Sequence, residues 1–457
     1  MNNQPIQKND IVTINVTALG LEGEGIGRVD TFAVFVPNAL VGDIVEVKII
    51  KVKSHFGYGK IINIVTPSKA RINPACESFP QCGGCQMQHM DYRQQLLWKQ
   101  QAVTDSLVRI GKLQDVVVHP TIGMADPTHY RNKAQYPIRQ NTVTGEIEIG
   151  FFAKQSHRIV QSDSCMIGHK DNAILIQIVK EWMKKNHIRA YDETSGKGLM
   201  RHLYTRTTHA KQEWMVVLVT NGDKQLPFES LIQVIQTQLP SIKSIYQNIN
   251  TRRDNTILGS QNRLLWGESY LFDTIGDCTF RISPHSFFQV NSTQTAVLYQ
   301  TAIDYADLKG HETVFDLYCG IGTISLFLAN KAKKVIGIEV VPQAIEDANE
   351  NAKINNITNT KFLTGTAEDI TPKLQKQGIK PDIIVIDPPR KGCEQALLDI
   401  LVVLNPPKIV YVSCNPATLA RDLNFLTQNG YTVKAVQPVD MFPWTRHVET
   451  VVLIERK

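Results

Sequence analysis

The segment 271–457 alternates short apolar runs with amphipathic stretches, and this alternation limits the possible folds more than any other feature of the chain. Four of the apolar runs indicate buried strands, at 313–318, 334–339, 382–387 and 408–413. Pro342, a residue suited to a first helical turn, opens the helical stretch after the second run. Strands alternating with helices predict an α/β fold with a doubly wound, mostly parallel sheet. Ligands of such sheets bind at the carboxyl ends of the strands.

Residues 1–66 follow another pattern, in which short alternating runs are separated by glycine-rich turns. The runs lie at 11–16, 32–36, 44–49 and 59–65. Their length and spacing predict a small, OB-like β-barrel. A basic and aromatic group in this segment suits either an oligonucleotide-binding face or an ordinary solvated hairpin, and comprises Lys51, Lys53, His55, Phe56, Tyr58 and Lys60.

Residues 67–270 mix strand and helix signals, and we expect an α+β central domain there. The stretch from Asp91 to Ile110 has helical periodicity. Its predicted buried face consists of Leu96, Leu97, Val103, Leu107 and Ile110. Basic and aromatic residues interleave in three further places, which suit phosphate binding or a solvated face: 129–133, 200–206 and 251–253.

The overall composition is that of a globular protein with two or three domains. A chain of 457 residues is too long for a single core. The net charge of +6 leans mildly toward a nucleic-acid partner. No apolar run approaches the roughly 20 residues that span a bilayer, and the first ten residues lack an apolar signal core. We therefore expect a cytoplasmic protein without a membrane partner, and a monomer.

The loop after the first strand of the α/β segment has the character of a cofactor site. It contains Gly320 and Gly322, which let the backbone pass close to a ligand at a helix start. A dinucleotide site would have a third glycine where this chain has Ser325. Asp316 before the loop would repel a pyrophosphate but suits an ammonium group, and Glu339 is placed to accept ribose hydroxyls. The pattern favours S-adenosylmethionine over a nicotinamide cofactor.

A second strand end carries a cysteine in the sequence Ser-Cys-Asn-Pro. Asn415 can cap a helix and Pro416 can start it, so that Cys414 would lie at a helix N-terminus, where the dipole favours a thiolate. This is the setting of an activated nucleophile. The alternative, a small apolar core residue, is the preferred interpretation for Cys278, Cys319 and Cys393.

A methyltransferase needs a thiolate when its target carbon is a poor nucleophile. C5 of a pyrimidine becomes an enolate carbon once a thiolate adds to C6, and the C5 proton must later be removed by a base. Glu449 precedes the last apolar run and is the candidate base. Its alternative interpretation is a solvated surface glutamate.

Together these motifs resemble the RNA uracil-C5 methyltransferases over essentially the whole chain. The motifs that carry the resemblance lie at 287–291, 316–322, 387–390, 413–416 and 447–450. The resemblance implies a Rossmann-like methyltransferase domain, Cys414 as nucleophile and Glu449 as base. It implies that Phe287 lies near a flipped target base. The cofactor-site positions that it implies are Gln289, Tyr318, Glu339 and Asp387.

Four cysteines outside this domain could hold a zinc ion or an iron–sulfur cluster, and their spacing does not decide between the two: Cys76, Cys82, Cys85 and Cys165. The Cys-Gly-Gly-Cys-Gln run at 82–86 is similar to the [4Fe-4S] site of family members that methylate 23S rRNA. The resemblance also implies that the N-terminal barrel is a TRAM domain that binds RNA. Both features point to 23S rRNA and away from the shorter branch that acts on tRNA.

Three other functions compete with this interpretation. Amino-group methyltransferases carry an aromatic residue after Asp-Pro-Pro, where this chain has Arg390. An iron–sulfur redox protein would cycle its cluster and bind a nicotinamide. A noncatalytic RNA-binding protein would keep its function without Cys414.

Overall fold

The computed structural model describes residues 5–161 and 164–457. The N-terminal segment forms a closed barrel of five strands in the order β1-β2-β3-β5-β4. Gly27 lies where β2 crosses β1, and a Cβ there would stand 1.9 Å from the Ile14 side chain. Alternate residues such as Val34 and Val47 fill the barrel. The strands are β1 (Ile11–Leu19), β2 (Gly25–Val29), β3 (Phe32–Val36), β4 (Ile44–Val52) and β5 (Phe56–Thr66).

The central region is built on a seven-stranded mixed sheet in the order β12-β11-β10-β9-β6-β7-β8. Helices α2 and α3 cover one face of it, and the other face joins the core of the C-terminal unit. Its elements are α1 (Tyr92–Arg109), β6 (Lys133–Gln140), β7 (Ile147–Phe152), β8 (Ile159–Gln161), α2 (Asn172–Lys185), β9 (Met200–Thr207), β10 (Trp214–Thr220), α3 (Phe228–Gln238), β11 (Ile242–Ile249) and β12 (Gln261–Gly267).

The C-terminal unit confirms the predicted α/β fold. Its seven-stranded sheet has the order β17-β16-β15-β18-β19-β21-β20, and all strands run in the same direction except β21, which is antiparallel to both of its neighbours. The elements are β13 (Leu271–Ile275), β14 (Cys278–Ile282), α4 (Ser292–Ala306), β15 (Thr313–Leu317), α5 (Thr323–Ala329), β16 (Lys334–Glu339), α6 (Pro342–Ile354), β17 (Thr360–Thr364), α7 (Ala367–Lys376), β18 (Ile383–Ile386), α8 (Gln395–Leu404), β19 (Lys408–Ser413), α9 (Pro416–Gln428), β20 (Tyr431–Val439) and β21 (Glu449–Arg456).

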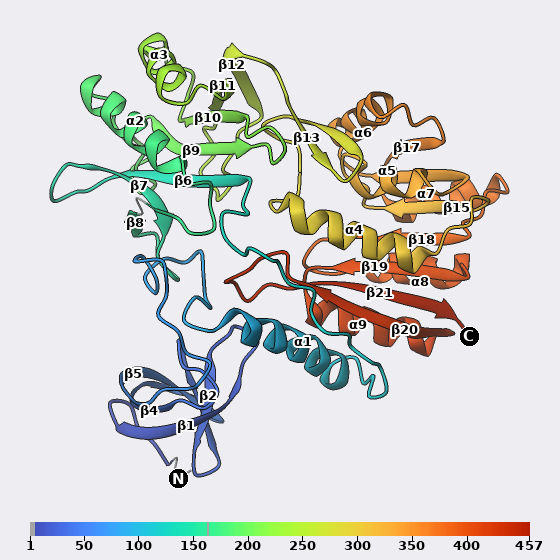
Figure 1. Cartoon of the computed structure of the whole chain (residues 1–457), viewed down its shortest axis with the longest axis horizontal. Helices are drawn as coiled ribbons and strands as arrows, with labels where there is room; N and C mark the ends of the chain where they lie inside the picture. Colours follow the sequence, from blue (N-terminus) through green and yellow to red (C-terminus); the bar gives the residue numbers. More distant parts are fainter. Residues whose placement is uncertain (1–4, 162–163) are drawn as a thin grey trace.

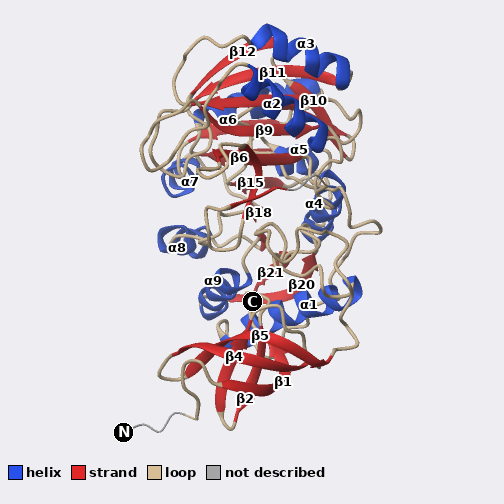
Figure 2. Cartoon of the chain, turned by 90° about the vertical axis from the view of Figure 1, so that its left-hand side faces the viewer, coloured by secondary structure: helices blue, strands red, loops and turns tan. Residues whose placement is uncertain are grey.

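Helix α1 connects the three parts of the molecule. It packs against α9 and β20, and the chain after it pairs with β20 at Val118 and Ile122. Figure 1 shows the barrel and the central sheet on the same side of the C-terminal sheet, with α1 running between barrel and sheet. Figure 2, the view from that side, shows the barrel and the central sheet at opposite ends of the molecule. The division of the chain at residues 66 and 270 remains our prediction.

The predicted buried face of α1 is only partly correct. Val103 and Leu107 are buried, but Leu97 is 57% exposed and Ile110 is 41% exposed. The buried face instead includes two polar side chains, Gln95 and Lys99. No helix in the described ranges is long and apolar enough to cross a membrane.

Candidate active site

Four strand ends bring the predicted site residues to one edge of the C-terminal sheet. Asp316 lies at the end of β15, Glu339 ends β16, and Asp387 follows β18 directly. Cys414 follows β19 and precedes α9, whose N-cap Asn415 accepts the Ala417 amide at 3.0 Å. All four side chains line one cavity of about 1100 Å³. The cavity therefore lies at the carboxyl ends of these strands, where we expected a ligand to bind.

The reversed direction of β21 adds Glu449 to the same edge. Because β19 and β21 are antiparallel, their ladder ends with Ser413 opposite Thr450. Cys414 follows Ser413 and Glu449 precedes Thr450. In an antiparallel ladder these two residues are therefore opposite each other on neighbouring strands. Glu449 is buried, which excludes the solvated surface glutamate that its sequence position also allowed.

Three carboxyl groups in the cavity have raised pKa values. Burial, followed by the charge of Asp387, raises the pKa of Glu449 to about 8, and Arg390 opposes the shift. Burial and the charge of Asp316 raise the pKa of Asp387 to about 7. Burial also raises the pKa of Asp316 to about 7 against the hydrogen bond from Ser325. A buried acidic pocket of this kind favours a cationic ligand, since a positive charge would lower all three pKa values.

The surroundings of Cys414 act against the thiolate that the helix N-terminus favours. Burial raises the pKa of the Cys414 thiol to about 11, and the charges of Glu449 and Asp387 add to this effect. Arg390 acts in the opposite direction but is outweighed. The helix N-terminus was the only local influence visible in the sequence, whereas burial and the charges of the two carboxyl groups come from segments distant in the chain.

The glycine loop has the shape and polarity that an S-adenosylmethionine site requires. A Cβ at Gly320 would meet no atom within 4 Å, so the backbone is open toward the cavity. Glu339 accepts the amides of Gly320 at 3.3 Å and Val341 at 3.0 Å, which fixes its carboxylate at the cavity wall. Asp316 uses one oxygen for Ser325 at 2.5 Å, and its other buried oxygen has no partner. These residues fit a ligand that carries both an ammonium group and ribose hydroxyls.

Tyr318 stands in this loop with a φ of 70°, in the left-handed region. A tyrosine there costs of order 1 kcal/mol or more, so surrounding contacts must hold it. Its amide donates to Ile338 O at 3.0 Å, and its side chain lines the cavity.

The segment with Phe287 and Gln289 forms another wall of the cavity. Phe287 is 65% exposed, whereas its neighbour Phe288 is buried in the core. Asn132 donates to Gln289 O at 2.9 Å, and the guanidinium of Arg206 donates to Ser286 O. Arg206 belongs to the basic stretch 200–206, for which we expected either phosphate binding or a solvated face. It is instead buried and supports this wall of the cavity.

The four predicted metal-ligand cysteines line the same cavity as the strand ends. Burial raises the pKa of the Cys85 thiol to about 12, and charges on the other three thiols would raise it further. All four are free of disulfides: Cys76, Cys82, Cys85 and Cys165. Within the described part of the chain, no group of three or more Cys, His, Asp or Glu side chains is arranged to hold a metal ion. Four thiols that line one cavity are nevertheless the donor set of an iron–sulfur cluster.

For several cavity residues, the sequence predicted no role in this site. Arg131 and Lys133, from the basic stretch 129–133, line the cavity, and so does Arg390, which follows Asp-Pro-Pro. His447 also lines the cavity, and burial lowers its pKa to about 4. The cationic residues would meet a polyanion that reached toward the cavity.

Comparisons with known proteins agree with this geometry. The family described as tRNA (Uracil-5-)-methyltransferase matches residues 91–457, and the TRAM domain matches residues 6–62. A protein named as an uncharacterized RNA methyltransferase of Halalkalibacterium halodurans is 49% identical over 99% of this chain and 98% of its own length. One from Clostridium acetobutylicum is also 49% identical, over 99% and 98%.

A solved structure extends the likeness to three dimensions. The tRNA (uracil-54, C5)-methyltransferase of Pyrococcus abyssi, in complex with S-adenosyl-L-homocysteine, has a TM-score of 0.78 and 27% identity. The match covers 97% of this chain and 99% of that one. The sheet edge, the acidic cavity and these relatives lead to one conclusion: the chain belongs to the tRNA (uracil-5-)-methyltransferase family and is an S-adenosylmethionine-dependent RNA methyltransferase.

Proposed function

We propose that this enzyme methylates C5 of a uridine in 23S rRNA, with Cys414 as nucleophile and Glu449 as general base. The observation that carries the proposal is the position of these two residues, which face each other across β19 and β21 at the wall of one cavity. An amino-group methyltransferase would have no use for either residue.

The reaction divides into addition and elimination. Cys414 gives its proton to solvent and its Sγ bonds to C6, while the C5=C6 electron pair moves toward C5 and O4 as an enolate. C5 uses that pair to bond the methyl group that S-adenosylmethionine would supply. The bond between that methyl group and the sulfonium sulfur would break, and S-adenosylhomocysteine would leave. Glu449 then takes the C5 proton, the C5=C6 bond re-forms, and the C6–S bond breaks to release the Cys414 thiolate. The proton on Glu449 finally passes to solvent.

S-adenosylmethionine supplies an electrophilic methyl group on a sulfonium centre. Asp316 would hold the ammonium group of the cofactor, and Glu339 would hold its ribose hydroxyls. We propose that Gln289, Tyr318 and Asp387 line the rest of its site, because all three border the cavity between the glycine loop and Cys414. The buried acidic pocket supports this assignment through its complementarity to a cation.

The target base must leave its stack, because C5 and C6 have to reach a half-buried thiol. Phe287, an exposed aromatic side chain on the cavity wall, is suited to pack against the flipped base. Arg131 and Lys133 would contact the flanking phosphates. The TRAM barrel would add contacts farther along the RNA.

We propose a [4Fe-4S] cluster on Cys76, Cys82, Cys85 and Cys165. Methyl transfer uses no electrons from the protein, so the cluster would order the segments that carry the cysteines. Zinc is the other group that four thiolates can hold.

Two classes of RNA are candidates for the substrate. The TRAM barrel and the cysteine set favour 23S rRNA. The Pyrococcus abyssi relative favours tRNA as a second candidate, because the match with that tRNA enzyme covers 97% of this chain. We therefore test both RNAs with the same assay.

The test is mass spectrometry of the protein after incubation with S-adenosylmethionine and 5-fluorouridine-containing RNA, transcribed as 23S rRNA or tRNA. Fluorine cannot leave C5 as a cation, so a methylated adduct on Cys414 should accumulate. Cys414→Ala should form no adduct while still binding S-adenosylmethionine. On ordinary RNA, Glu449→Gln should accumulate the adduct, because elimination lacks its base. Normal turnover by either variant would refute the mechanism, and the RNA that forms the adduct identifies the substrate class.

A further inference from the structure

The loop 440–448 carries the proposed base into the cavity. It connects β20 to β21, so its shape decides where Glu449 begins the last strand. Phe442, Thr445 and His447 on this loop line the cavity as well. Figure 1 shows the loop, in dark red, projecting from the C-terminal sheet toward the other two parts of the molecule.

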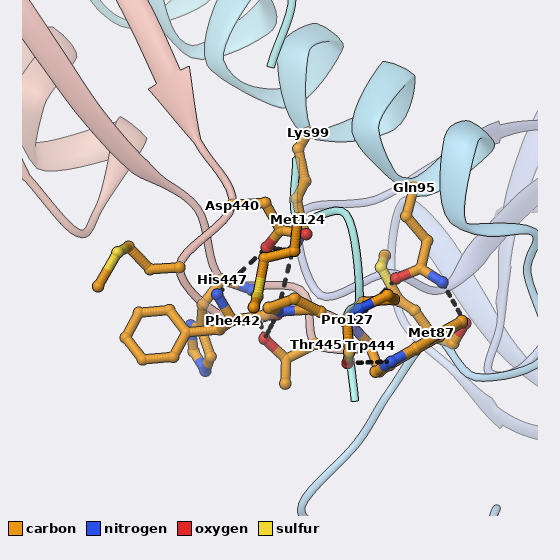
Figure 3. Close-up of polar contacts among 12 residues, drawn as sticks. Met87, Gln95, Lys99, Met124, Pro127, Asp440, Phe442, Trp444, Thr445 and His447 are labelled. Atoms are coloured by element: carbon orange, nitrogen blue, oxygen red, sulfur yellow. Dashed lines mark hydrogen bonds and ion pairs between the residues drawn. The ribbon is translucent and has the colours of Figure 1, made fainter. Parts of the chain in front are cut away.

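A buried ion pair from α1 holds the start of this loop. Lys99 donates to Asp440 Oδ1 at 2.5 Å and to Phe442 O at 3.1 Å, and the side chains of the ion pair are fully buried. Tyr92, about two helical turns earlier on α1, donates to Asp440 Oδ2 at 2.9 Å. The Phe442 amide donates to Asp440 Oδ1 at 3.2 Å, so both carboxylate oxygens are used. Figure 3 shows Lys99 reaching down from the helix to Asp440.

The middle of the loop is held at Trp444. Its amide donates to Gln95 Oε1 at 3.2 Å, and its indole donates to Pro127 O at 2.8 Å. Its carbonyl accepts the amides of Gln86 at 3.1 Å and Met87 at 3.0 Å. The side-chain amide of Gln95 also donates to Met87 O at 3.1 Å, as Figure 3 shows. All of these partners lie outside the C-terminal unit.

These contacts fix a conformation that the loop would not adopt unaided. Trp444 has a φ of 67°, in the left-handed region, which costs of order 1 kcal/mol or more. A buried ion pair adds little net stability, because desolvation offsets its attraction, but it does select one geometry. The contacts also join the base to the cysteines, since Gln86 follows Cys85 directly.

We propose that Lys99 and Gln95 are positioning residues for the general base: through Asp440 and Trp444 they set the loop that places Glu449 against the substrate carbon. This inference rests on the proposed function, because it assumes that Glu449 removes the C5 proton. Neither residue reaches the cavity, so they act on catalysis through the loop alone. A displacement of the base should slow elimination more than addition, because Cys414 is carried by β19 and α9.

The test measures the covalent protein–RNA adduct during turnover of ordinary RNA. Lys99→Met keeps the length of the side chain and removes the charge; Gln101→Met, at an exposed position of α1, is the matched control. We expect Lys99→Met to lower kcat by about tenfold to a hundredfold. We expect the adduct fraction on denaturing gels to rise at least fivefold (an estimate from the same loss of alignment). S-adenosylmethionine affinity and the RNA KM should stay near the control values.

Lys99→Met leaves Asp440 buried without its cation, which can impair folding. The double variant Lys99→Met/Asp440→Leu removes both charges and should regain the thermal stability of the wild type while its adduct fraction stays high. Folded variants that lose activity without adduct accumulation, or that turn over normally, would overturn the inference. Glu449→Gln, measured beside the Lys99 variants, separates the role of the base from the role of the positioning residues. If Glu449→Gln accumulates no adduct, the assignment of Glu449 as the base is wrong. If Glu449→Gln accumulates the adduct and the Lys99 variants do not, only the positioning role is wrong.

Discussion

Replacement of Glu449 by glutamine should change how the stability of the ligand-free protein depends on pH. The pKa of Glu449 is about 8 in the folded protein, against its ordinary value of 4.5 in the unfolded chain. The folded state therefore binds the proton more tightly, so stability is greatest below pH 4.5 and is lost as the pH rises through 8. Each pH unit between these values costs up to about 1.4 kcal/mol. From pH 5.5 to 7.5 this group alone accounts for up to about 3 kcal/mol.

The assay is thermal unfolding of the wild type and Glu449→Gln at pH 5.5 and 7.5 without cofactor. For a unit the size of the C-terminal one, about 3 kcal/mol corresponds to about 6–12 °C in Tm. Between pH 5.5 and 7.5 the Tm of the wild type should therefore fall by about 6–12 °C more than the Tm of the variant. Glu455→Gln, at a more accessible position of β21, should behave like the wild type. The pKa values of Asp387 and Asp316 are raised as well, so the variant keeps part of the dependence of stability on pH. An equal loss of Tm in the wild type and the variant would refute the reasoning.

Two further predictions concern the ligands. Asp316→Asn keeps the contact with Ser325 but removes the charge, and should weaken S-adenosylmethionine binding by about tenfold to a hundredfold in calorimetry; an unchanged Kd would show that the unpartnered oxygen does not face the ammonium group. Cys85→Ser in anaerobically purified protein should lose bound iron and the broad visible absorption of a [4Fe-4S] cluster, whereas Cys278→Ser, in the core, should keep both. Zinc instead of iron in the wild type would contradict the cluster, and no metal in either protein would contradict a metal site altogether.

Local patterns in the sequence were enough to predict the architecture of the chain. The apolar runs predicted at 313–318, 334–339, 382–387 and 408–413 form β-strands of one sheet, and Asp316, Glu339, Asp387 and Cys414 lie at or directly after their carboxyl ends. Parallel strands bring their carboxyl ends to the same edge, so the sequence could also place these side chains together. The five-stranded barrel followed from alternation and glycine turns in the same way.

The burial and the charges around the site residues come from contacts between segments that are distant in the sequence. Helical periodicity assigned Leu97 to the buried face of α1, yet Gln95 and Lys99 are buried there because their partners lie about 340 residues later, in the loop that leads to Glu449. The helix N-terminus favours a thiolate at Cys414, yet burial, followed by the charges of Glu449 on β21 and of Asp387 after β18, raises the pKa of the thiol. A single sequence reports the neighbours of a residue along the chain, and burial and charge at this site come from neighbours across the fold.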